Sequence, residues 1–589
     1  MSFHPNDIAR RTRLSTIALT VGFLVLTGAF FNAQILDHAK YAMQSEENRL
    51  RSIPVPAPRG IIYDLRGDII AENLPGYSVS ILSPRVDSLR ATLSRLSQII
   101  PITPREIENA VRRFRRAPNR PTVVLADASI DVVSVLEEHR LDYPQMIIQS
   151  VPKRYYPDGP LVASFVGYTG EITETELNLP KYAGYKPGQI VGKGGLEKEY
   201  EAVLHGKEGV KFDEVDARGR PVRTSSMRPD ISPVPAPAMK TNIDMKLQRQ
   251  VAAIFSDTLM GGAIAMDPKT GAVLALYSNP SFDPNRFTGG IPVDYWKELN
   301  TDPRKPLFNK VIQGTYPPAS TYKLATATIA LQNKLVRLDE HMPISCTGGM
   351  QYGRRYFRCW EKRGHGSLDL KGAIMKSCDV YFYQLGIRIG LSNLVAGGIS
   401  LGMREKSGID LPNEYSPVFP YKDVKEYYNR KYGAGNWSNS ESLNLSIGQG
   451  NNSQTVANMA KFYAALATDG HNAKPFLVNR KPERKQILNL TPEQLARVRL
   501  ALAGVVSEGG TAGGSRIEGL VIAGKTGTAQ NPPNPDHAWF VGFAPADNPV
   551  ILVAVFLEFG QHGWSAARVA SRIMGYYTGK LPAEVVVTE

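Results

Sequence analysis

Three short segments of the chain contain the residue types of a serine acyl-transfer centre. In the first, two residues separate Ser320 from Lys323, which places a hydroxyl nucleophile and a basic nitrogen on one side of a helical turn. The second, at 377–379, has the sequence Ser-Cys-Asp and adds a hydroxyl and a carboxylate. The third, at 525–528, has the sequence Lys-Thr-Gly-Thr and supplies a cation that can bind a carboxylate. Each is weak alone, but together they predict one reaction centre.

Two of these patterns also occur elsewhere in the chain. Ser150 and Lys153 have the S-x-x-K spacing, but Pro152 lies between them and excludes a regular helix interior. Ser320 instead follows two prolines and precedes small and apolar residues, which is typical of a helix start, although a serine there can also simply cap the helix. The K-T-G at 269–271 follows Asp-Pro and predicts a hairpin turn, whereas the one at 525–527 lies in a predicted strand.

The second motif has a competitor. Ser442 and Asn444 form a literal S-x-N later in the chain. We prefer Ser377 and Asp379, because 377–379 falls between two apolar helical segments within 367–390. The choice between the two segments stays open on sequence alone.

In this order the motifs are the S-x-x-K, S-x-N/D and K-T-G set of penicillin-recognising enzymes. The chain resembles the class B penicillin-binding proteins, specifically the elongation-type penicillin-binding protein 2 group. Asp379, where the superfamily more often has Asn, resembles this subgroup. The segment 59–67 is similar to the R-G-x-I-x-D motif that opens the pedestal (dimerisation) module of the family. The resemblance covers nearly the whole chain after its N-terminal apolar segment.

The resemblance implies a peptidoglycan D,D-transpeptidase that acts during cell elongation and shape maintenance. Ser320 would attack the penultimate D-alanine carbonyl of a stem peptide ending in D-Ala-D-Ala, and Lys323, as a neutral amine, would take its proton. The backbone N–H groups of Ser320 and Thr528 would form the oxyanion hole. The implied catalytic residues are Ser320, Lys323, Ser377, Asp379 and Lys525, and the implied substrate-binding residues are Lys525, Thr526, Gly527 and Thr528. The same site would be acylated and inhibited by β-lactams, and the chemistry requires no cofactor.

Two other functions share these motifs. A D,D-carboxypeptidase or β-lactamase-like hydrolase would pass the acyl group to water, but no additional base for deacylation can be located in the sequence. A non-catalytic β-lactam sensor would usually carry several membrane spans or a different N-terminal domain. The long pedestal favours a synthase. By family analogy, the partners would be a RodA-type glycosyltransferase and other membrane proteins of the elongation complex.

All three cysteines lie in one window together with a histidine, as C-x12-C-x5-H-x12-C: Cys346, Cys359, His365 and Cys378. This set can supply the four ligands of a structural zinc ion. A Cys346–Cys359 disulfide with Cys378 free is the alternative, since the predicted compartment is oxidising. The histidine favours zinc, and some elongation-type relatives carry a metal site near this place.

Residues 14–31 form an uncharged apolar stretch just long enough, at about 18 residues, to span a bilayer. Arg10, Arg11 and Arg13 precede it and Asp37 follows, which predicts a cytoplasmic N-terminus. A cleaved signal peptide is the alternative, but the stretch is long and ends in Phe-Phe-Asn, a poor cleavage site. We therefore expect a single-pass inner-membrane protein with a periplasmic catalytic domain.

The net charge of +14 suits an anionic partner. The sequence contains no nucleic-acid-binding module and no dense Lys/Arg block, so a membrane surface or an acidic polymer fits better than nucleic acid. A positively charged surface that serves only solubility would explain the same net charge.

At 589 residues the chain is too long for one ordinary core. A Pro/Ser-rich stretch marks a linker. Beyond it the sequence predicts a helix at 247–259, strands at 263–267 and 272–276, helices at 320–333 and 367–390, strands around 519–531, 538–544 and 550–557, and a closing helix near 564–577. Strands at both ends with helices between them predict an antiparallel sheet flanked by helices. We expect an α+β protein with a cytoplasmic tail (1–13), a transmembrane anchor (14–36), an elongated α/β pedestal (37–225), a linker (226–239) and a serine β-lactamase-like transpeptidase domain (240–589).

Overall fold

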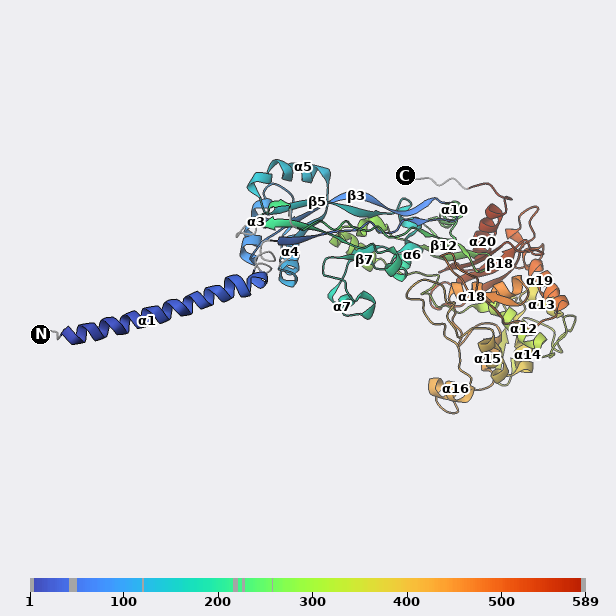
Figure 1. Cartoon of the computed structure of the whole chain (residues 1–589). Coiled ribbons are helices and arrows are strands. Elements are labelled where there is room, and N and C mark those ends of the chain that lie inside the picture. Colours follow the sequence, from blue (N-terminus) through green and yellow to red (C-terminus); the bar gives the residue numbers. More distant parts are fainter. Residues whose placement is uncertain are drawn as a thin grey trace.

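The computed structural model describes residues 5–41, 50–118, 121–215, 221–224, 228–256 and 258–583. The molecule is elongated, with a long N-terminal helix projecting from one end and the C-terminal domain at the other (Figure 1). That helix, α1 (Pro5–Phe31), continues into the π-helical turn η1 (Asn32–Leu36). Within the described residues, 9–36 form the one helix long and apolar enough to cross a membrane, with a mean hydropathy of 2.0. The hydroxyls of Thr16, Thr20 and Thr27 donate to carbonyls four residues earlier, so these polar groups are satisfied without water.

The pedestal contains a head region with its own core. The long strand β3 pairs with both β4 and β5, and the helices α3 and α4 pack on this sheet. Helix α4 begins with a capping box in which Thr103 accepts from the Glu106 N–H and the Glu106 carboxylate accepts from the Thr103 N–H. The buried head cluster includes Leu89, Leu93 and Phe114.

The pedestal elements are the strands β1 (Leu50–Val55), β2 (Ile62–Tyr63), β3 (Ile69–Ile81), β4 (Thr122–Ala128), β5 (Met146–Tyr155), β6 (Thr169–Glu171), β7 (Ile190–Gly192), β8 (Gly209–Val215) and β9 (Pro221–Thr224). Its helices are α3 (Val86–Leu96), α4 (Pro104–Arg116), α5 (Ile130–Glu138), η2 (Arg140–Asp142), η3 (Gly159–Leu161), α6 (Ala163–Val166), α7 (Glu174–Leu177), η4 (Pro180–Tyr182), α8 (Gly195–Glu199) and α9 (Glu201–Leu204). Strands β1, β8 and β9 form a separate antiparallel sheet, and β6 pairs with β7. Ser150 and Lys153 lie in strand β5, so the rejected S-x-x-K is extended backbone.

The R-G-x-I-x-D segment joins the pedestal to the C-terminal domain. Arg59 is buried and bonds Glu197 at 2.7 Å and Glu201 at 2.9 Å. The Asp64 carboxylate accepts from the backbone N–H of Met245 at 3.2 Å, at the start of the next domain. Strand β10 (Met239–Lys240) pairs in parallel with β2, so the pedestal sheet includes Met239, the last residue of the predicted linker, and the residue that follows it. Residues 225–227 lie outside the described part.

The C-terminal domain is built on a five-stranded antiparallel sheet in the order β12-β11-β19-β18-β17. Helices α10 and α20 pack together on one face of this sheet, and α18 covers the other (Figure 1). The sheet strands are almost wholly buried, which explains their continuous apolar runs. The predicted α+β architecture, with an antiparallel sheet between helices, is confirmed.

The sheet strands are β11 (Gly261–Met266), β12 (Val273–Asn279), β17 (Ala523–Ala529), β18 (His537–Ala544) and β19 (Ile551–Leu557), with two hairpins β13 (Gly349–Tyr352)–β14 (Arg355–Arg358) and β15 (His471–Ala473)–β16 (Arg484–Gln486) outside them. The helices are α10 (Met245–Phe255), η5 (Pro284–Phe287), α11 (Val293–Thr301), η6 (Ala319–Tyr322), α12 (Lys323–Gln332), α13 (Leu370–Met375), α14 (Asp379–Ile389), α15 (Leu391–Ser400), α16 (Val424–Tyr432), α17 (Glu441–Ser446), α18 (Val456–Ala467), α19 (Pro492–Val506), η7 (Gly513–Ser515) and α20 (Gly563–Tyr577). The K-T-G at 269–271 forms the turn between β11 and β12, where Asp267 accepts from the Lys269 N–H, as predicted.

Candidate active site

Ser320 lies in a tightly held 3-10 turn, η6, directly before the buried helix α12. Ala319 has φ of 48°, a left-handed conformation that costs a non-glycine residue about 1–3 kcal/mol and persists only where the surroundings enforce it. Here its N–H donates to the Gly448 carbonyl at 3.0 Å, and the Thr321 hydroxyl donates to the Pro318 carbonyl at 2.6 Å. Ser320 is partly exposed although Ala319 and Thr321 are buried. The fold therefore presents one hydroxyl from an otherwise buried turn.

Lys323 connects the first motif to the second. Its side chain is fully buried, and its Nζ donates to Asp379 Oδ1 at 2.7 Å, to the Ser377 carbonyl at 2.8 Å and to Ser377 Oγ at 3.2 Å. The three acceptors match the three N–H groups of an ammonium, and Asp379 supplies the counter-charge that a buried cation requires.

The second motif occupies the break between α13 and α14. Ser377 has φ of 55°, so the predicted helical region 367–390 is interrupted at this residue. Burial raises the pKa of Asp379, and the nearby Lys323 ammonium opposes this effect. A residue that the sequence did not point to, Trp360, fixes this turn. Its backbone N–H donates to Asp379 Oδ2 at 3.0 Å, and its ring N–H donates to the Ser377 carbonyl at 3.0 Å.

The alternative second motif lies elsewhere. Ser442 is in helix α17, and its hydroxyl donates to the Asn439 carbonyl at 2.7 Å. Lys323 Nζ donates its hydrogen bonds to Ser377 and Asp379. The structure thus brings 377–379, and not 442–444, to the Lys323 ammonium.

The third motif lies on β17, which pairs with β18 at the edge of the sheet. A Cβ atom at Gly527 would lie 3.0 Å from the Pro318 carbonyl oxygen and 3.2 Å from Thr321 Cγ2. A glycine here therefore lets the strand approach the Ser320 turn closely. The Thr528 hydroxyl accepts from the N–H of Gly563 at 3.2 Å, at the start of α20.

Lys525 is fully buried, and its Nζ donates to the Thr526 carbonyl at 3.1 Å. Burial lowers the pKa of Lys525 well below its usual value, and the Lys323 ammonium lowers it further. The site thus holds a partly exposed hydroxyl, two buried amines and one buried carboxylate. This combination can deprotonate a nucleophile and bind an anionic group, as acyl transfer to serine requires.

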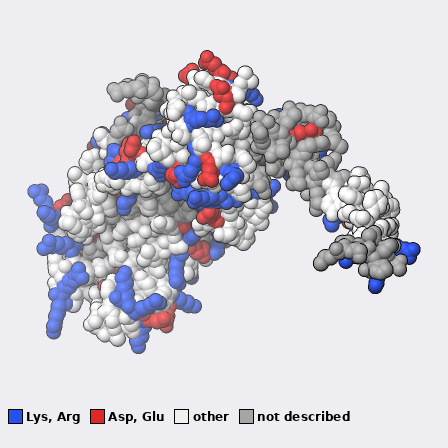
Figure 2. Space-filling view, turned by 90° about the vertical axis from the view of Figure 1, so that its left-hand side faces the viewer, with Lys and Arg blue, Asp and Glu red and all other residues white. Residues whose placement is uncertain are grey.

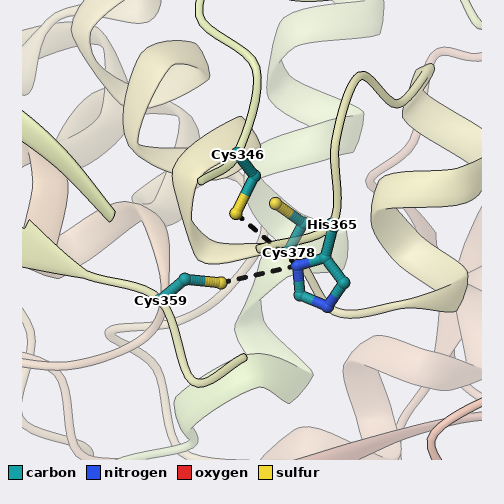
Figure 3. Close-up of side chains that lie close together, drawn as sticks. All are labelled: Cys346, Cys359, His365 and Cys378. Carbon is teal, nitrogen blue, oxygen red and sulfur yellow. Dashed lines mark hydrogen bonds between the residues drawn. The ribbon is translucent and has the colours of Figure 1, made fainter. Parts of the chain in front are cut away.

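The four predicted metal ligands lie close together and form a cluster that includes Cys378 of the second motif (Figure 3). Cys346, Cys359, His365 and Cys378 place their ligand atoms within 4.8 Å of one another. His365 Nδ1 lies 3.7 Å from Cys346 Sγ and 3.6 Å from Cys359 Sγ. The three cysteines are buried and are not joined by a disulfide. The cluster touches the active site because Cys359 Sγ accepts from the Asp379 N–H at 3.4 Å.

Comparison with known proteins decides the family. Residues 261–575 match the family described as "Penicillin binding protein transpeptidase domain", and residues 54–232 match "Penicillin-binding Protein dimerisation domain". The chain belongs to the class B penicillin-binding proteins, in the penicillin-binding protein 2 group. Peptidoglycan D,D-transpeptidase MrdA of Acinetobacter baumannii is 33% identical over 94% of this chain and 85% of its own length. MrdA of Escherichia coli K12 is 30% identical over 96% of this chain and 94% of its own length.

Solved penicillin-binding protein 2 structures share the fold. The Helicobacter pylori protein in complex with MreC matches with a TM-score of 0.80 and 27% identity, covering 90% of this chain and 100% of the other. The Pseudomonas aeruginosa protein in complex with WCK 5153 matches with a TM-score of 0.68 and 30% identity, covering 90% and 99%. The two family matches and these structures confirm the predicted fold of a pedestal followed by a transpeptidase domain.

Proposed function

We propose that Ser320 is the acylated nucleophile of this peptidoglycan D,D-transpeptidase. The observation that carries the proposal is the meeting of three distant segments: Lys323 Nζ bonds both Ser377 and Asp379, and β17 lies against the Ser320 turn at Gly527. The stem peptide would lie along the edge of β17, with its terminal D-Ala-D-Ala beside Ser320.

In acylation, Lys323 first loses one proton to solvent from the ammonium form that the resting site holds. As the neutral amine it then takes the Ser320 hydroxyl proton while Ser320 Oγ bonds to the carbonyl carbon of the penultimate D-alanine. The C–N bond then breaks, and Ser377 passes a proton from Lys323 to the leaving nitrogen of the terminal D-alanine. Asp379 orients both groups through its contact with Lys323. The N–H groups of Ser320 and Thr528 would stabilise the oxyanion.

Lys525, Thr526 and Thr528 would hold the terminal carboxylate of the substrate or of a β-lactam, and Gly527 permits the close approach. The lowered pKa of Lys525 means that its ammonium is disfavoured in the empty site. A bound carboxylate offsets this, so we expect binding to draw a proton onto Lys525. In the second half-reaction, an amine of a neighbouring stem peptide takes the acyl group and forms the cross-link.

Labelling of the full-length protein with a fluorescent penicillin tests this assignment. Ser320→Ala should abolish covalent labelling, and Ser377→Ala should slow it, whereas Ser442→Ala, the matched control from the rejected motif, should leave the rate within about twofold. Labelling that survives Ser320→Ala would refute the nucleophile. Equal losses in Ser377→Ala and Ser442→Ala would refute the choice of second motif.

We also propose that Cys346, Cys359, His365 and Cys378 bind a structural zinc ion. Ligand atoms around tetrahedral zinc lie about 3.5–3.8 Å apart, given bonds of about 2.3 Å to sulfur and about 2.1 Å to nitrogen. The distances of 3.6 and 3.7 Å from His365 to two of the sulfur atoms fit this spacing. The disulfide alternative would require about 2.05 Å between two sulfur atoms and would leave His365 without a role. Elemental analysis should find one zinc per chain. Thiol titration of the protein unfolded in the presence of a chelator should find no disulfide. A zinc-free protein with one titratable thiol would favour the disulfide.

The apolar N-terminal helix and the positive net charge of the chain both support attachment to a membrane. We propose a tail at 1–13, a membrane-spanning helix at 14–36, a periplasmic pedestal at 37–225, a linker at 226–239 and a periplasmic transpeptidase domain at 240–589. Arg10, Arg11 and Arg13, which lie in α1 just before its apolar part, support this orientation. Lys and Arg side chains gather on the lower part of the face shown in Figure 2, consistent with the net charge of +14 and an acidic polymer as substrate.

The partners we propose are a RodA-type glycosyltransferase and an MreC-like protein. A Helicobacter pylori relative was solved with MreC, and a further structural match, with a TM-score of 0.69 and 27% identity over 98% of this chain, is described as a peptidoglycan synthase complex. Depletion should produce rounded cells if the chain serves elongation; filaments would contradict this subgroup role.

A further inference from the structure

A groove of about 640 Å³ lies beside the third motif, between the glycine-rich loop 508–516 and the start of helix α20. The acyl-transfer mechanism above does not use this groove. Its lining includes Trp564 and the charged side chains of Glu508, Arg516 and Arg568. The loop has the sequence Glu-Gly-Gly-Thr-Ala-Gly-Gly-Ser-Arg, and the lack of side chains on its glycines leaves the groove open.

Two hydrogen bonds connect the loop that lines the groove to the residue before the second motif and to the third motif. Lys376, which precedes Ser377, donates to the Gly509 carbonyl at 2.9 Å. Thr511 shares a hydroxyl hydrogen bond of 2.6 Å with Thr526 of the third motif. The loop that lines the groove is therefore hydrogen-bonded to Thr526, the residue that would hold the carboxylate of the leaving D-alanine.

The first residues of α20 complete this connection. A Cβ at Gly563 would lie 2.7 Å from the carbonyl oxygen of Gly527 and 2.9 Å from Thr526 Cβ, so the start of α20 is pressed against β17. Trp564, the next residue, is 46% exposed, and the Arg568 guanidinium lies over its ring at 5.7 Å. An exposed tryptophan with a stacked arginine offers both an apolar surface and a partner for a carboxylate.

The charge of the groove favours an anionic ligand. Glu508 and Arg516 form an ion pair of 3.6 Å, which leaves the Arg568 charge in excess in the lining. Exposed pairs of this kind are weak, so a ligand carboxylate can replace Glu508 as the partner of Arg516 at little cost.

The chemistry of the second half-reaction indicates which substrate must lie beside the leaving-group side of Ser320. Acylation breaks the bond between the acyl carbon and the nitrogen of the terminal D-alanine. Cross-linking forms a bond between the same acyl carbon and the nitrogen of another amine, so it is the reverse of that step. By microscopic reversibility the incoming amine attacks from the side on which the first one left. The acceptor nitrogen bonds to the acyl carbon, the ester bond to Ser320 Oγ breaks, and the proton lost by nitrogen returns to that oxygen. The rest of the acceptor molecule must extend away on the leaving-group side.

We propose that the groove between loop 508–516 and Trp564 binds the acceptor stem peptide. Its ligand is a peptide that carries the attacking amine and at least one carboxylate beyond the position held by Thr526 and Thr528. Trp564 packs against the peptide backbone, and Arg568 pairs with the additional carboxylate. This assignment rests on the proposed transpeptidase function and extends it to the second substrate.

The test uses the full-length protein in detergent with two acceptors. The donor is a synthetic stem pentapeptide ending in D-Ala-D-Ala with its own amines acetylated. One acceptor is a synthetic stem tetrapeptide with a free side-chain amine; the other is glycine, which is too short to reach the groove. Each reaction is scored as the ratio of aminolysed to hydrolysed donor, because both products come from one acyl-enzyme. Arg568→Gln should lower this ratio about tenfold with the tetrapeptide, the loss expected for one charge-assisted contact. Trp564→Ala should also lower it about tenfold, because it removes the apolar ring surface that the peptide covers. Both changes should alter the ratio less than about twofold with glycine.

Controls separate this proposal from the proposed function. Arg572→Gln removes a cation from the exposed side of the same helix one turn further on, outside the groove lining, and should leave both ratios unchanged. Fluorescent-penicillin labelling in the same samples reports the Ser320 chemistry independently. Labelling that does not depend on Ser320 would refute the proposed transpeptidase function. Normal labelling together with an unchanged tetrapeptide ratio would refute the groove assignment. Equal losses with tetrapeptide and glycine would also overturn it, because they would indicate a structural role.

Binding decides the question if the isolated protein turns over too slowly. The affinity of the tetrapeptide for full-length Ser320→Ala protein should fall about tenfold when Arg568→Gln is added and should not change with Arg572→Gln. Equal affinities in all three proteins would overturn the assignment.

Discussion

Gly527 provides a direct test of whether the close approach of β17 to the Ser320 turn matters. In Gly527→Ala the added methyl carbon would lie 3.0 Å from the Pro318 carbonyl oxygen, 3.2 Å from Thr321 Cγ2 and 3.2 Å from Trp539 Cβ. Two of these atoms belong to the Ser320 turn, which is held by its own hydrogen bonds. An ordinary carbon–oxygen contact needs about 3.4 Å or more. The strand must therefore move away from the turn by several tenths of an ångström.

This displacement carries Lys525 and Thr526 away from the hydroxyl nucleophile. A misplacement of about 1 Å can cost about 100-fold in rate, so a shift of about half that size should slow penicillin acylation roughly tenfold. The unfolding midpoint should change little, because alanine loses less entropy than glycine on folding and partly offsets the crowding.

The assay is the second-order rate constant for fluorescent-penicillin labelling, measured beside a urea unfolding curve. Gly170→Ala is a matched control: this glycine also lies in a strand, but its added methyl would meet only the flexible Lys193 side chain, at 3.4 Å. A normal acylation rate in Gly527→Ala would refute the reasoning, since the relation between β17 and Ser320 would then be dispensable. A loss of rate accompanied by gross unfolding would point to stability instead.

Three further predictions concern the charges and the pedestal. Asp379→Asn should slow acylation at least tenfold. Both carboxylate oxygens of Asp379 accept hydrogen bonds, one from Lys323 and one from the Trp360 N–H, and an amide would have to turn its NH₂ group toward one of these donors. A normal labelling rate would contradict this prediction. The acylation rate should fall as pH rises through the lowered pKa of Lys525, because lysine is cationic only below its pKa. A rate with no decline as pH rises would exclude a role for this ammonium, and a decline only near the ordinary value of about 10.5 would show that the pKa of Lys525 is not lowered. Thr103→Ala should destabilise the head region by about 1 kcal/mol in urea unfolding without affecting labelling, whereas an unchanged midpoint would show that the capping box contributes nothing.

The fold was largely predictable because its elements have strong local signals. The apolar runs near residues 263–276 and 538–557 predicted the sheet strands, and α20 follows the predicted helix at 564–577 closely. Helix α10 begins at Met245, two residues before the predicted start at Leu247, because Asp244 caps it through the N–H groups of Lys246 and Leu247. Such an extension depends on one side chain and not on periodicity.

The site was predictable only as motifs and not as a geometry. The sequence offered two candidate second motifs, and only the packing of α14 against α12 brings Ser377 to Lys323. The left-handed conformations of Ala319 and Ser377 carry no sequence signal, since both residue types usually avoid this region. Trp360 and Thr511 were missed because their contacts join segments far apart in the chain, and nothing near either residue indicates its partner.

The cysteine cluster is directly connected to the Asp379 carboxylate, for which we propose a catalytic role. Two consecutive residues, Cys359 and Trp360, each engage Asp379, the first by accepting its N–H at Sγ and the second by donating its own N–H to Oδ2. Cys378, another member of the cluster, is the residue that connects Ser377 to Asp379 along the chain. Zinc bound by these cysteines would therefore fix the position of Asp379 from two directions without taking part in the chemistry. The buried Lys323 ammonium relies on Asp379 for its counter-charge, so disorder in the cluster would reach the nucleophile turn through a single carboxylate.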